Sequence, residues 1–343
     1  MLHINARGVS EALHNGLQAI DSCGVTVETR NGDALEFPYP VCTEYTHPRE
    51  RVLFYPERDA NPFFHMLESL WMLDGRNDVQ WISEYNGRIN TYSDDGVTFH
   101  GAYGYRWKKH WFDQLEIIIH RLKTYNNDRR CVLSMWDPVT DLVVNNDGKD
   151  YPCNTQIYFS ARKVFDSELK SLDMTVVNRS NDLVWGAYGA NAVHMSYLQE
   201  YVAQMCGFGV GKYYQFSNNL HVYMDVFEKV KPIITDADYE PYLTLAEDGL
   251  SYSSPFLIND TKTFNRELHT WMLMDETEWI AEDQRDKAER FKNKYLIKTA
   301  SPIRFAWRLW KQKLLDEALE VAYCIEDRAW RLACLEWLER RKK

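Results

Sequence analysis

The spacing of apolar residues predicts a helix over residues 61–74, NPFFHMLESLWMLD. Asn61 is suited to cap this helix, and Pro62 fits its first turn. The apolar side chains that share one face are Phe64, Leu67, Leu70 and Trp71. Because Glu68 lies on or beside that face, this helix brings a carboxylate to the edge of a buried stripe.

The rest of the first 260 residues alternates between extended and helical patterns. Runs rich in β-branched or aromatic residues predict strands over 131–136, 155–161, 171–179 and 213–219. Helical periodicity predicts helices over 110–125, 190–206 and 221–230. Residues 25–56 are expected to form short extended segments, with a turn at 29–33. Residues 84–104 are rich in Gly, Tyr, Asn and Asp and are expected to form a functional loop.

The character of the chain changes near residue 260, where charged residues become frequent and the pattern stays helical. Residues 306–341 pair Trp, Leu and Ala with Arg, Lys and Glu, which predicts two antiparallel amphipathic helices. We therefore divide the chain into a domain over residues 1–259 and a helical extension over residues 260–343.

Composition narrows the class of protein. Of the 343 residues, 45% are hydrophobic and 26% are charged, as in an ordinary globular protein. No apolar run has the length of a membrane span, and the first residues lack an apolar signal core, so we expect a cytoplasmic protein. A net charge of −10 argues against direct nucleic-acid binding and means that an anionic substrate would need a local cluster of arginines.

Cysteine is the first candidate for chemistry. The seven cysteines form no C-x-x-C pair, which fits a reducing compartment, and the histidines show no metal-ligand pattern, so no metal site is predicted. Cys153 follows Pro152 at the start of a predicted strand. A lone cysteine is usually a buried core thiol. A nucleophile would need nearby cations to lower its pKa, and Arg129, Arg130 and Arg179 are the candidates.

Seven motifs in order between Thr29 and Tyr223 resemble the thymidylate synthase superfamily, which includes the nucleotide hydroxymethylases. They are TRNG (29–32), FHMLESLWMLDGRND (64–78), GAYGYRW (101–107), DRRCVLSMWDP (128–138), PCN (152–154), NRSNDLVWGAYGAN (178–191) and LHVYMD (220–225). A single one of these motifs would carry little weight, whereas all seven in order are specific.

The resemblance implies a role for each matching residue. Cys153 is the nucleophile, Glu68 the acid/base residue, and Tyr103 takes the place of the family's tyrosine. The implied phosphate ligands are Arg30, Arg179, Ser180, and Arg129 and Arg130 from a second copy of the chain. The implied ligands of the sugar hydroxyl are His221 and Tyr223. Asn191 reads the base, and Asp182 binds the pterin ring of a folate.

The resemblance also implies a fold and an assembly. We expect an α/β (α+β) three-layer domain with a large twisted mixed sheet, followed by the C-terminal helices. Two sheets would stack back to back in a homodimer with a shared active site. The substrates would be a pyrimidine nucleoside monophosphate and 5,10-methylenetetrahydrofolate.

Four departures from thymidylate synthases bear on the product. Residues 87–96 contain no Trp where the family has one that shields the methylene intermediate, and Asn90 lies about there. The apolar closing tail is replaced by charged helices. Asn154 follows the nucleophile where His is common, and residues 186–191 carry one extra residue. A polar side chain at position 90 would place water against the methylene, which gives a hydroxymethyl group instead of a methyl group.

The base is assigned through Asn191, because a carboxamide can pair with O4 and N3–H of uracil. The bland alternative for Asn191 is a helix N-cap. We therefore predict a deoxyuridylate hydroxymethylase that converts dUMP to 5-hydroxymethyl-dUMP, of the kind that phages use to modify their DNA in the host cytoplasm. The alternatives are a thymidylate synthase, a dCMP or CMP hydroxymethylase, and an inactive relative that serves as a binding module.

Overall fold

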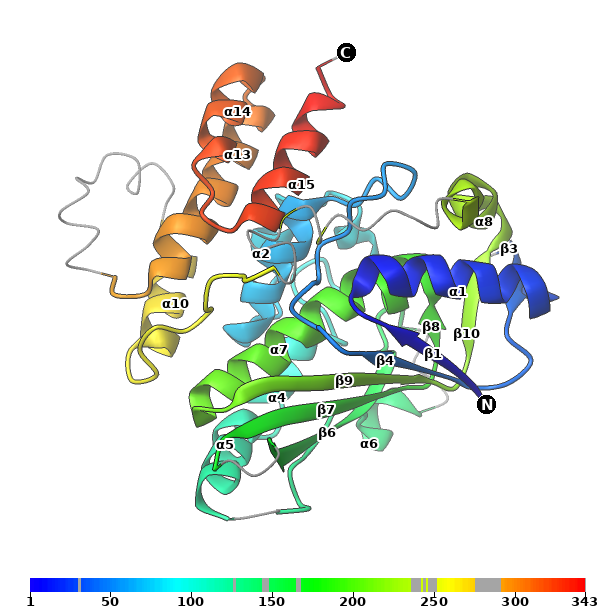
Figure 1. The fold of residues 1–343 in the computed structure, drawn as a ribbon, viewed down its shortest axis with the longest axis horizontal. Helices are drawn as coiled ribbons and strands as arrows, with labels where there is room; N and C mark the ends of the chain where they lie inside the picture. The colour runs from blue at the N-terminus through cyan, green and yellow to red at the C-terminus, as the bar shows by residue number, and fades with distance from the viewer. Residues whose placement is uncertain are drawn as a thin grey trace.

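The computed structural model shows a layered molecule in which helices cover one face of a large sheet (Figure 1). The residues that it describes are 1–29, 32–125, 128–143, 148–164, 168–235, 242, 245, 252–274 and 291–342.

Six strands form the large sheet. In spatial order they are β1 (Leu2–Ala6), β4 (Val41–Tyr45), β9 (Gly209–Ser217), β7 (Lys170–Asn178), β6 (Asn154–Lys163) and β5 (Val132–Ser134). The pairs β1–β4 and β7–β9 are parallel and the other three are antiparallel, so the sheet is mixed. The α/β class and the large mixed sheet are thereby confirmed.

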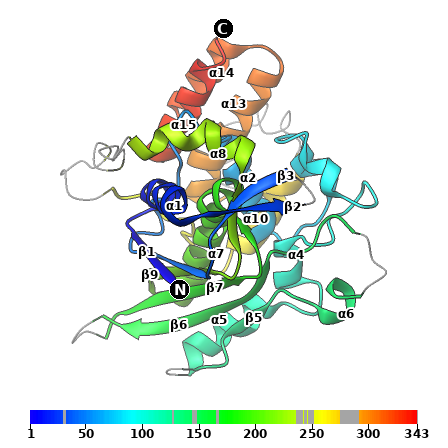
Figure 2. The ribbon, with the colours of Figure 1, turned by 90° about the vertical axis from the view of Figure 1, so that its right-hand side faces the viewer.

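The two faces of this sheet differ. In β7, Leu172, Met174 and Val176 are fully buried, while the alternate residues are half-buried, as the two-residue period of a strand requires. Helices α1 (Val9–Cys23) and α7 (Asn191–Cys206) lie along the buried face (Figures 1 and 2). The other face carries partly exposed side chains such as Tyr158.

A second, smaller sheet was not predicted. Its order is β2 (Val25–Thr29), β3 (Gly32–Glu36), β10 (Leu220–Tyr223) and β8 (Asn181–Asp182). Because β10 pairs with both β3 and β8, the helix predicted over 221–230 begins only at Met224, as α8 (Met224–Val230). This pairing sets His221 beside Asp182.

Short helices connect the sheets and surround one end of the large sheet. They are α3 (Val79–Ser83), the 3₁₀ helix η1 (Ile89–Tyr92), α4 (Tyr103–Lys108), α5 (Gln114–Thr124), α6 (Pro138–Asp141), the π-helical segment η2 (Leu183–Ala190) and the 3₁₀ helix η3 (Lys231–Thr235). Among the described residues, no helix is both long and apolar enough to span a membrane.

Helix α2 (Pro62–Leu73) forms as predicted and is buried along its whole length. The Asn61 side chain caps it by accepting a hydrogen bond from the Phe64 N–H at 3.1 Å. Helix α7 packs on one side of it and the C-terminal helices pack on another (Figure 1).

The helices of the C-terminal region are α10 (Phe264–Leu273), the π-helical turn η4 (Leu296–Ala300), α13 (Ser301–Lys311), α14 (Leu315–Tyr323) and α15 (Arg328–Glu339). The last three take the place of the two helices predicted over 306–341. The rings of Trp307 and Trp337 lie 5.5 and 5.4 Å from that of Phe63 in α2, centroid to centroid. The helices on both sides of residue 260 therefore share one hydrophobic core. The domain boundary between residues 259 and 260 remains a prediction that rests on the change in composition.

Candidate active site

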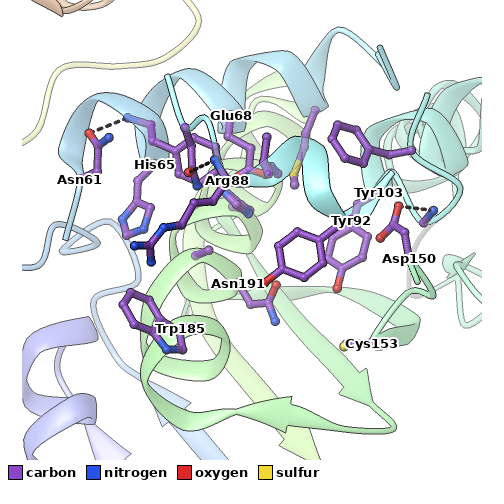
Figure 3. Close-up of a pocket in the computed structure, with 18 of the residues that line it drawn as sticks. Asn61, His65, Glu68, Arg88, Tyr92, Tyr103, Asp150, Cys153, Trp185 and Asn191 are labelled. Carbon is purple, nitrogen blue, oxygen red and sulfur yellow. Dashed lines mark hydrogen bonds and ion pairs between the residues drawn. The ribbon is translucent and has the colours of Figure 1, made fainter. Parts of the chain in front are cut away.

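A cavity of about 750 Å³ opens between α2, α7, η1 and the start of β6, a size suited to small-molecule ligands. Four of the residues predicted for the site line it: Glu68, Tyr103, Cys153 and Asn191. Figure 3 shows Glu68 on the α2 side, Cys153 on the far side, and Tyr103 and Asn191 between them. The structure thus brings together residues from four separate motifs.

Cys153 immediately precedes β6, and its carbonyl accepts a hydrogen bond from the Arg179 N–H at 2.9 Å. The Arg179 guanidinium is held by the Pro152 carbonyl, to which its Nε donates at 3.0 Å. Burial raises the pKa of the Cys153 thiol, and Arg179 opposes that rise. Asp150 and Asp182 add to it. Arg179 thus acts in the expected direction, but the thiol pKa stays above its ordinary value because burial outweighs this cation.

Tyr103 opens α4, which lies directly against α2. A Cβ on Gly104 would come within 2.0 Å of the Met72 carbonyl oxygen, so only glycine permits this approach. Burial raises the pKa of Tyr103 above its usual range, and Cys153 adds to the rise. The tyrosine is therefore a neutral phenol that can donate a hydrogen bond into the cavity.

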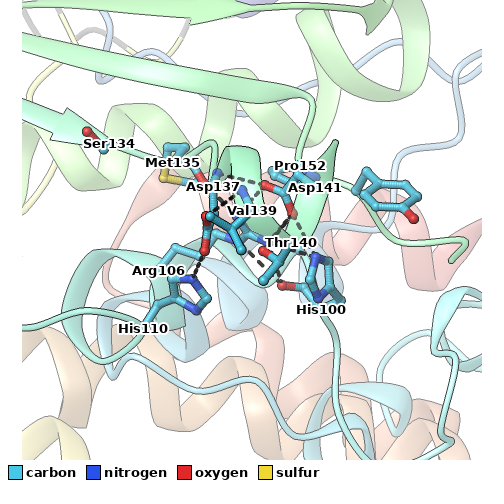
Figure 4. Close-up of polar contacts among 12 residues, drawn as sticks. His100, Arg106, His110, Ser134, Met135, Asp137, Val139, Thr140, Asp141 and Pro152 are labelled. Atoms are coloured by element: carbon cyan, nitrogen blue, oxygen red, sulfur yellow. Dashed lines mark hydrogen bonds and ion pairs between the residues drawn. The ribbon is translucent and has the colours of Figure 1, made fainter. Parts of the chain in front are cut away.

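A buried ion pair anchors α4, the helix that begins at Tyr103 (Figure 4). Arg106, fully buried, donates to both carboxylate oxygens of Asp141, at 2.6 and 2.8 Å. His100 Nε2 lies 2.7 Å from the same carboxylate. The Gly101 N–H donates to Asp150 at 2.8 Å, close to the segment that leads into Cys153. This network was not predicted from the sequence, although a buried arginine needs a carboxylate or another acceptor as its partner.

Glu68 meets a residue that the sequence reading missed. His194 of α7 is 3% exposed, and its Nε2 lies 3.0 Å from Glu68 Oε2. It also lines the cavity, three positions after Asn191 and hence on the same helical face. That spacing is the signal that would have found it. His65 lines the cavity as well, and burial, reinforced by Arg58 and His194, lowers its pKa well below the ordinary value.

Asn191 is the first residue of α7 and has helical backbone angles, so the N-cap interpretation is wrong. Its Nδ2 donates to Asn181 Oδ1 at 3.0 Å, and Asn181 Nδ2 in turn donates to Ser217 Oγ at 3.3 Å. Gly186 permits this pairing, because a Cβ there would come within 2.5 Å of Asn181 Oδ1. The amide pair fixes which edge of Asn191 a ligand would meet.

The predicted sugar and folate ligands lie at the β8–β10 pair and do not line the cavity. Asp182 Oδ1 accepts hydrogen bonds from the N–H groups of Val184 and Trp185, at 2.9 and 2.6 Å. Its Oδ2 is buried without a hydrogen-bond partner among the described residues, and burial raises the pKa of this carboxyl. The rings of His221 and Tyr223 pack edge to face, 5.5 Å apart.

Asn90 does not face the cavity, which corrects the role predicted for it. In the three-residue turn of η1, Ile89 and Tyr92 share one face and line the cavity, whereas Asn90 is rotated away and exposed. The wall at this point also carries Arg88 (Figure 3).

The predicted phosphate ligands are not gathered into this cavity. Arg129 and Arg130 are exposed just before β5, and Ser180 is half-buried between β7 and β8. Arg179 contributes to a separate hollow of about 440 Å³ with Trp136 and Gln156. Arg30 lies outside the described residues.

The mouth of the cavity is tied to the C-terminal helices. Asp59, which lines the cavity, forms ion pairs with Arg340 and Arg341 at 3.2 and 2.8 Å. Beside it, the Arg58 guanidinium lies 4.1 Å from the ring centre of Trp185. The charged C-terminal segment therefore contacts the rim of the cavity directly.

Comparisons with known proteins agree with this architecture. The family model for thymidylate synthase matches residues 58–275. The deoxyuridylate hydroxymethyltransferase of Pseudomonas phage M6 is 44% identical over 99% of this chain and 94% of that protein. The enzyme of the same name from Bacillus phage SP01 is 40% identical over 54% of this chain and 50% of its own. Thymidylate synthase of Streptococcus suis (strain 05ZYH33) is 34% identical over 54% of this chain and 66% of its own.

Among solved structures, the crystal structure of thymidylate synthase from T4 phage superposes with a TM-score of 0.52. The match covers 66% of this chain and 80% of that one at 20% identity, and it shows a common fold.

The raised thiol pKa predicts a characteristic alkylation profile for Cys153. Because the thiolate is the reactive form, iodoacetamide should modify Cys153 at least about tenfold more slowly at pH 7.5 than the exposed Cys324, and the rate should climb as the pH rises through the thiol pKa. Arg179→Ala should move the midpoint to still higher pH. Peptide mass spectrometry measures each cysteine separately. A Cys153 rate that already levels off below pH 8 would contradict the burial argument.

Proposed function

The chain is a one-carbon transferase of the thymidylate synthase family, and we propose that it converts dUMP to 5-hydroxymethyl-dUMP. The observation that carries this proposal is the cavity that joins Cys153, Glu68 and Asn191. It occurs in a chain that is similar over almost its whole length to a phage deoxyuridylate hydroxymethyltransferase.

Cys153 is the proposed nucleophile. Its thiolate adds to C6 of the pyrimidine, the S–C6 bond forms, and the electron pair moves onto C5 and O4 as an enolate. C5, which is otherwise a poor nucleophile, can then accept a one-carbon unit. Arg179 favours the thiolate electrostatically, and the Tyr103 phenol can donate a hydrogen bond beside it.

Asn191 is the proposed reader of the base. Its pairing with Asn181 uses one N–H, which leaves its carbonyl oxygen and second N–H for a ligand. These match N3–H and O4 of uracil, whereas cytosine presents the opposite pattern. A mismatched buried pair costs about 1–3 kcal/mol, which is enough to favour dUMP over dCMP at least severalfold.

The one-carbon donor is proposed to be 5,10-methylenetetrahydrofolate, which supplies the carbon when bound. The cavity is large enough for a drug-sized ligand beside its reacting residues. The unpartnered, buried Oδ2 of Asp182 is a ready acceptor for N–H groups of a heterocycle. Asp182 itself does not line the cavity, but Trp185, whose N–H it holds, offers an aromatic surface there.

Polar groups that interrupt the largely apolar cavity wall support water as the final acceptor. In residues 87–96, where thymidylate synthases have a shielding tryptophan, η1 contributes Ile89 and Tyr92 to the wall, and the neighbouring Arg88 also lines it. His65 and Asn86 add further polar groups to the wall. Such a wall can hold water near the methylene, so the hydroxymethyl product does not depend on Asn90.

A homodimer is proposed to complete the phosphate site. Arg129 and Arg130 lie away from the cavity of their own chain, beside a sheet whose outer face is only half-buried. Arg179 and Trp136 meet on that outer face. A second copy stacked on it would bring its two arginines toward Arg179 and so gather the local positive charge that an anionic substrate needs in a chain of net charge −10.

The similarity to phage proteins supports a compartment and a purpose for the reaction. We place the enzyme in the cytoplasm of an infected host, where dUMP and folate are present. There it would supply a modified pyrimidine nucleotide for phage DNA.

The product test is an incubation with methylenetetrahydrofolate and either dUMP or dCMP, followed by mass spectrometry of the nucleotide. We expect 5-hydroxymethyl-dUMP from dUMP, no dihydrofolate, and a preference for dUMP. Cys153→Ser should lower turnover by at least about a thousandfold while retaining dUMP binding, because only the nucleophile is lost. A methyl product with stoichiometric dihydrofolate would identify a thymidylate synthase instead.

A matched variant of the base reader controls this assay. Asn191→Asp replaces the donating N–H by an acceptor, so it should lower kcat/KM for dUMP and raise kcat/KM for dCMP relative to that for dUMP. An unchanged dUMP-to-dCMP ratio would remove Asn191 as the base reader.

The shared site predicts complementation between two inactive variants. Arg129→Ala/Arg130→Ala should lack the arginines that reach across, and Cys153→Ala should lack the nucleophile. Co-expressed in equal amounts, they should form heterodimers with one intact site and regain about a quarter of wild-type activity. Activity no higher than that of either variant alone, although heterodimers are recovered by two affinity tags, would show that the site is not shared.

A further inference from the structure

His194 has no role in the reaction steps proposed above. Its Nε2 lies 3.0 Å from Glu68 Oε2, yet this nitrogen is buried and has no hydrogen-bond partner among the described residues. The two groups are therefore close but out of line with each other. Both residues line the cavity, Glu68 from α2 and His194 from α7. A water molecule in the cavity could contact both atoms at ordinary hydrogen-bond distance.

Three other histidine–carboxylate pairs in the described part of the chain are hydrogen-bonded, and a fourth, His3 with Glu44 at 4.0 Å, is at an exposed histidine. His100 and His110 make hydrogen bonds to Asp141 and Asp137, at 2.7 and 3.0 Å. His269 makes one to Asp74, at 3.1 Å. None of these histidines lines the cavity. His194 thus combines an unpartnered buried nitrogen with access to the candidate active site.

The position of His194 suits it to receive a proton from a water molecule in the cavity. Glu68 Oε2, 3.0 Å from Nε2, lies where a carboxylate lies beside a catalytic histidine. Burial keeps the neighbouring His65 neutral by lowering its pKa, so His65 does not compete for that proton.

We propose that His194 and Glu68 bind the water that adds to the methylene carbon and that His194 accepts its proton. This inference rests on the proposed function. The water oxygen forms a bond to the exocyclic carbon, and its proton moves to His194 Nε2. The C5=CH₂ electron pair moves into the C5–C4–O4 enolate. As the enolate collapses, the C5=C6 bond forms again and the S–C6 bond breaks, which releases Cys153 as a thiolate.

The step requires no oxidant or reductant and differs in this respect from hydride transfer, which yields a methyl group. Proton removal by a positioned base contributes about 10²–10⁴-fold to such a step. The pair also explains how water can be placed although Asn90 points into solvent.

The test is a partition experiment with His194→Gln, which keeps a polar side chain but removes the base. Turnover of [5-³H]dUMP is run with 2-mercaptoethanol, a thiol that can capture the methylene without a protein base. Wild type should give mainly 5-hydroxymethyl-dUMP. In the variant, the ratio of thioether to hydroxymethyl product should rise at least about tenfold, while tritium release from C5 continues. Both products come from the same active molecules, so partial unfolding does not alter their ratio.

Two measurements separate this role from a structural one. Calorimetry without folate should give His194→Gln the dUMP affinity of wild type within about threefold, because His194 acts after the base is bound. His269→Gln is the matched control, since it removes another histidine–carboxylate contact next to α2 but outside the cavity. Its product ratio should equal that of wild type.

The outcomes distinguish the two proposals. If hydroxymethyl product and tritium release fall together in His194→Gln without thioether, His194 has no role in the addition of water and the inference is wrong. If wild type itself yields methyl product and dihydrofolate, the proposed function fails first, whatever the variant does.

Discussion

Helix α2 is buried on every side, and its contact with α7 sets the geometry of the whole cavity. A helix that is buried in this way can carry a carboxylate only where that carboxylate has a polar partner and faces a cavity. Glu68 meets both conditions, with His194 beside it and the cavity in front. The same face of α7 carries Asn191, so two packed helices position the acid/base group, its histidine partner and the base reader together.

Burial also governs the chemical state of the reacting groups. It raises the pKa of the Cys153 thiol and of Tyr103, lowers that of His65, and lowers that of Arg58 to about 10. In the free site, burial therefore favours the neutral forms of Cys153, Tyr103 and His65. A bound anion and the arginines that hold it would change the pKa values of these groups. Arg179, the cation that opposes the rise in the thiol pKa, therefore connects the nucleophile to the proposed phosphate site.

The sequence predicted whatever depended on local pattern or on a motif. The helix after Asn61, the central strands and the grouping of Glu68, Tyr103, Cys153 and Asn191 belong to this class. The errors came from context. The turn of η1 rotates Asn90 outward, and residues 221–223, which the helical pattern had assigned to a helix, belong to β10. Asn191, for which an N-cap was the alternative role, is instead the first residue of α7. His194 was missed because its meaning depends on a residue 126 positions earlier in the chain, across a helix contact.

The central claim is that water, and not hydride, completes the reaction in this cavity. Its most direct test is turnover of dUMP with methylenetetrahydrofolate in H₂¹⁸O, with mass spectrometry of the nucleotide. The account predicts a hydroxymethyl group that carries one ¹⁸O atom, formed without dihydrofolate. A product that carries a methyl group, with no oxygen from the solvent and one dihydrofolate per turnover, would contradict it.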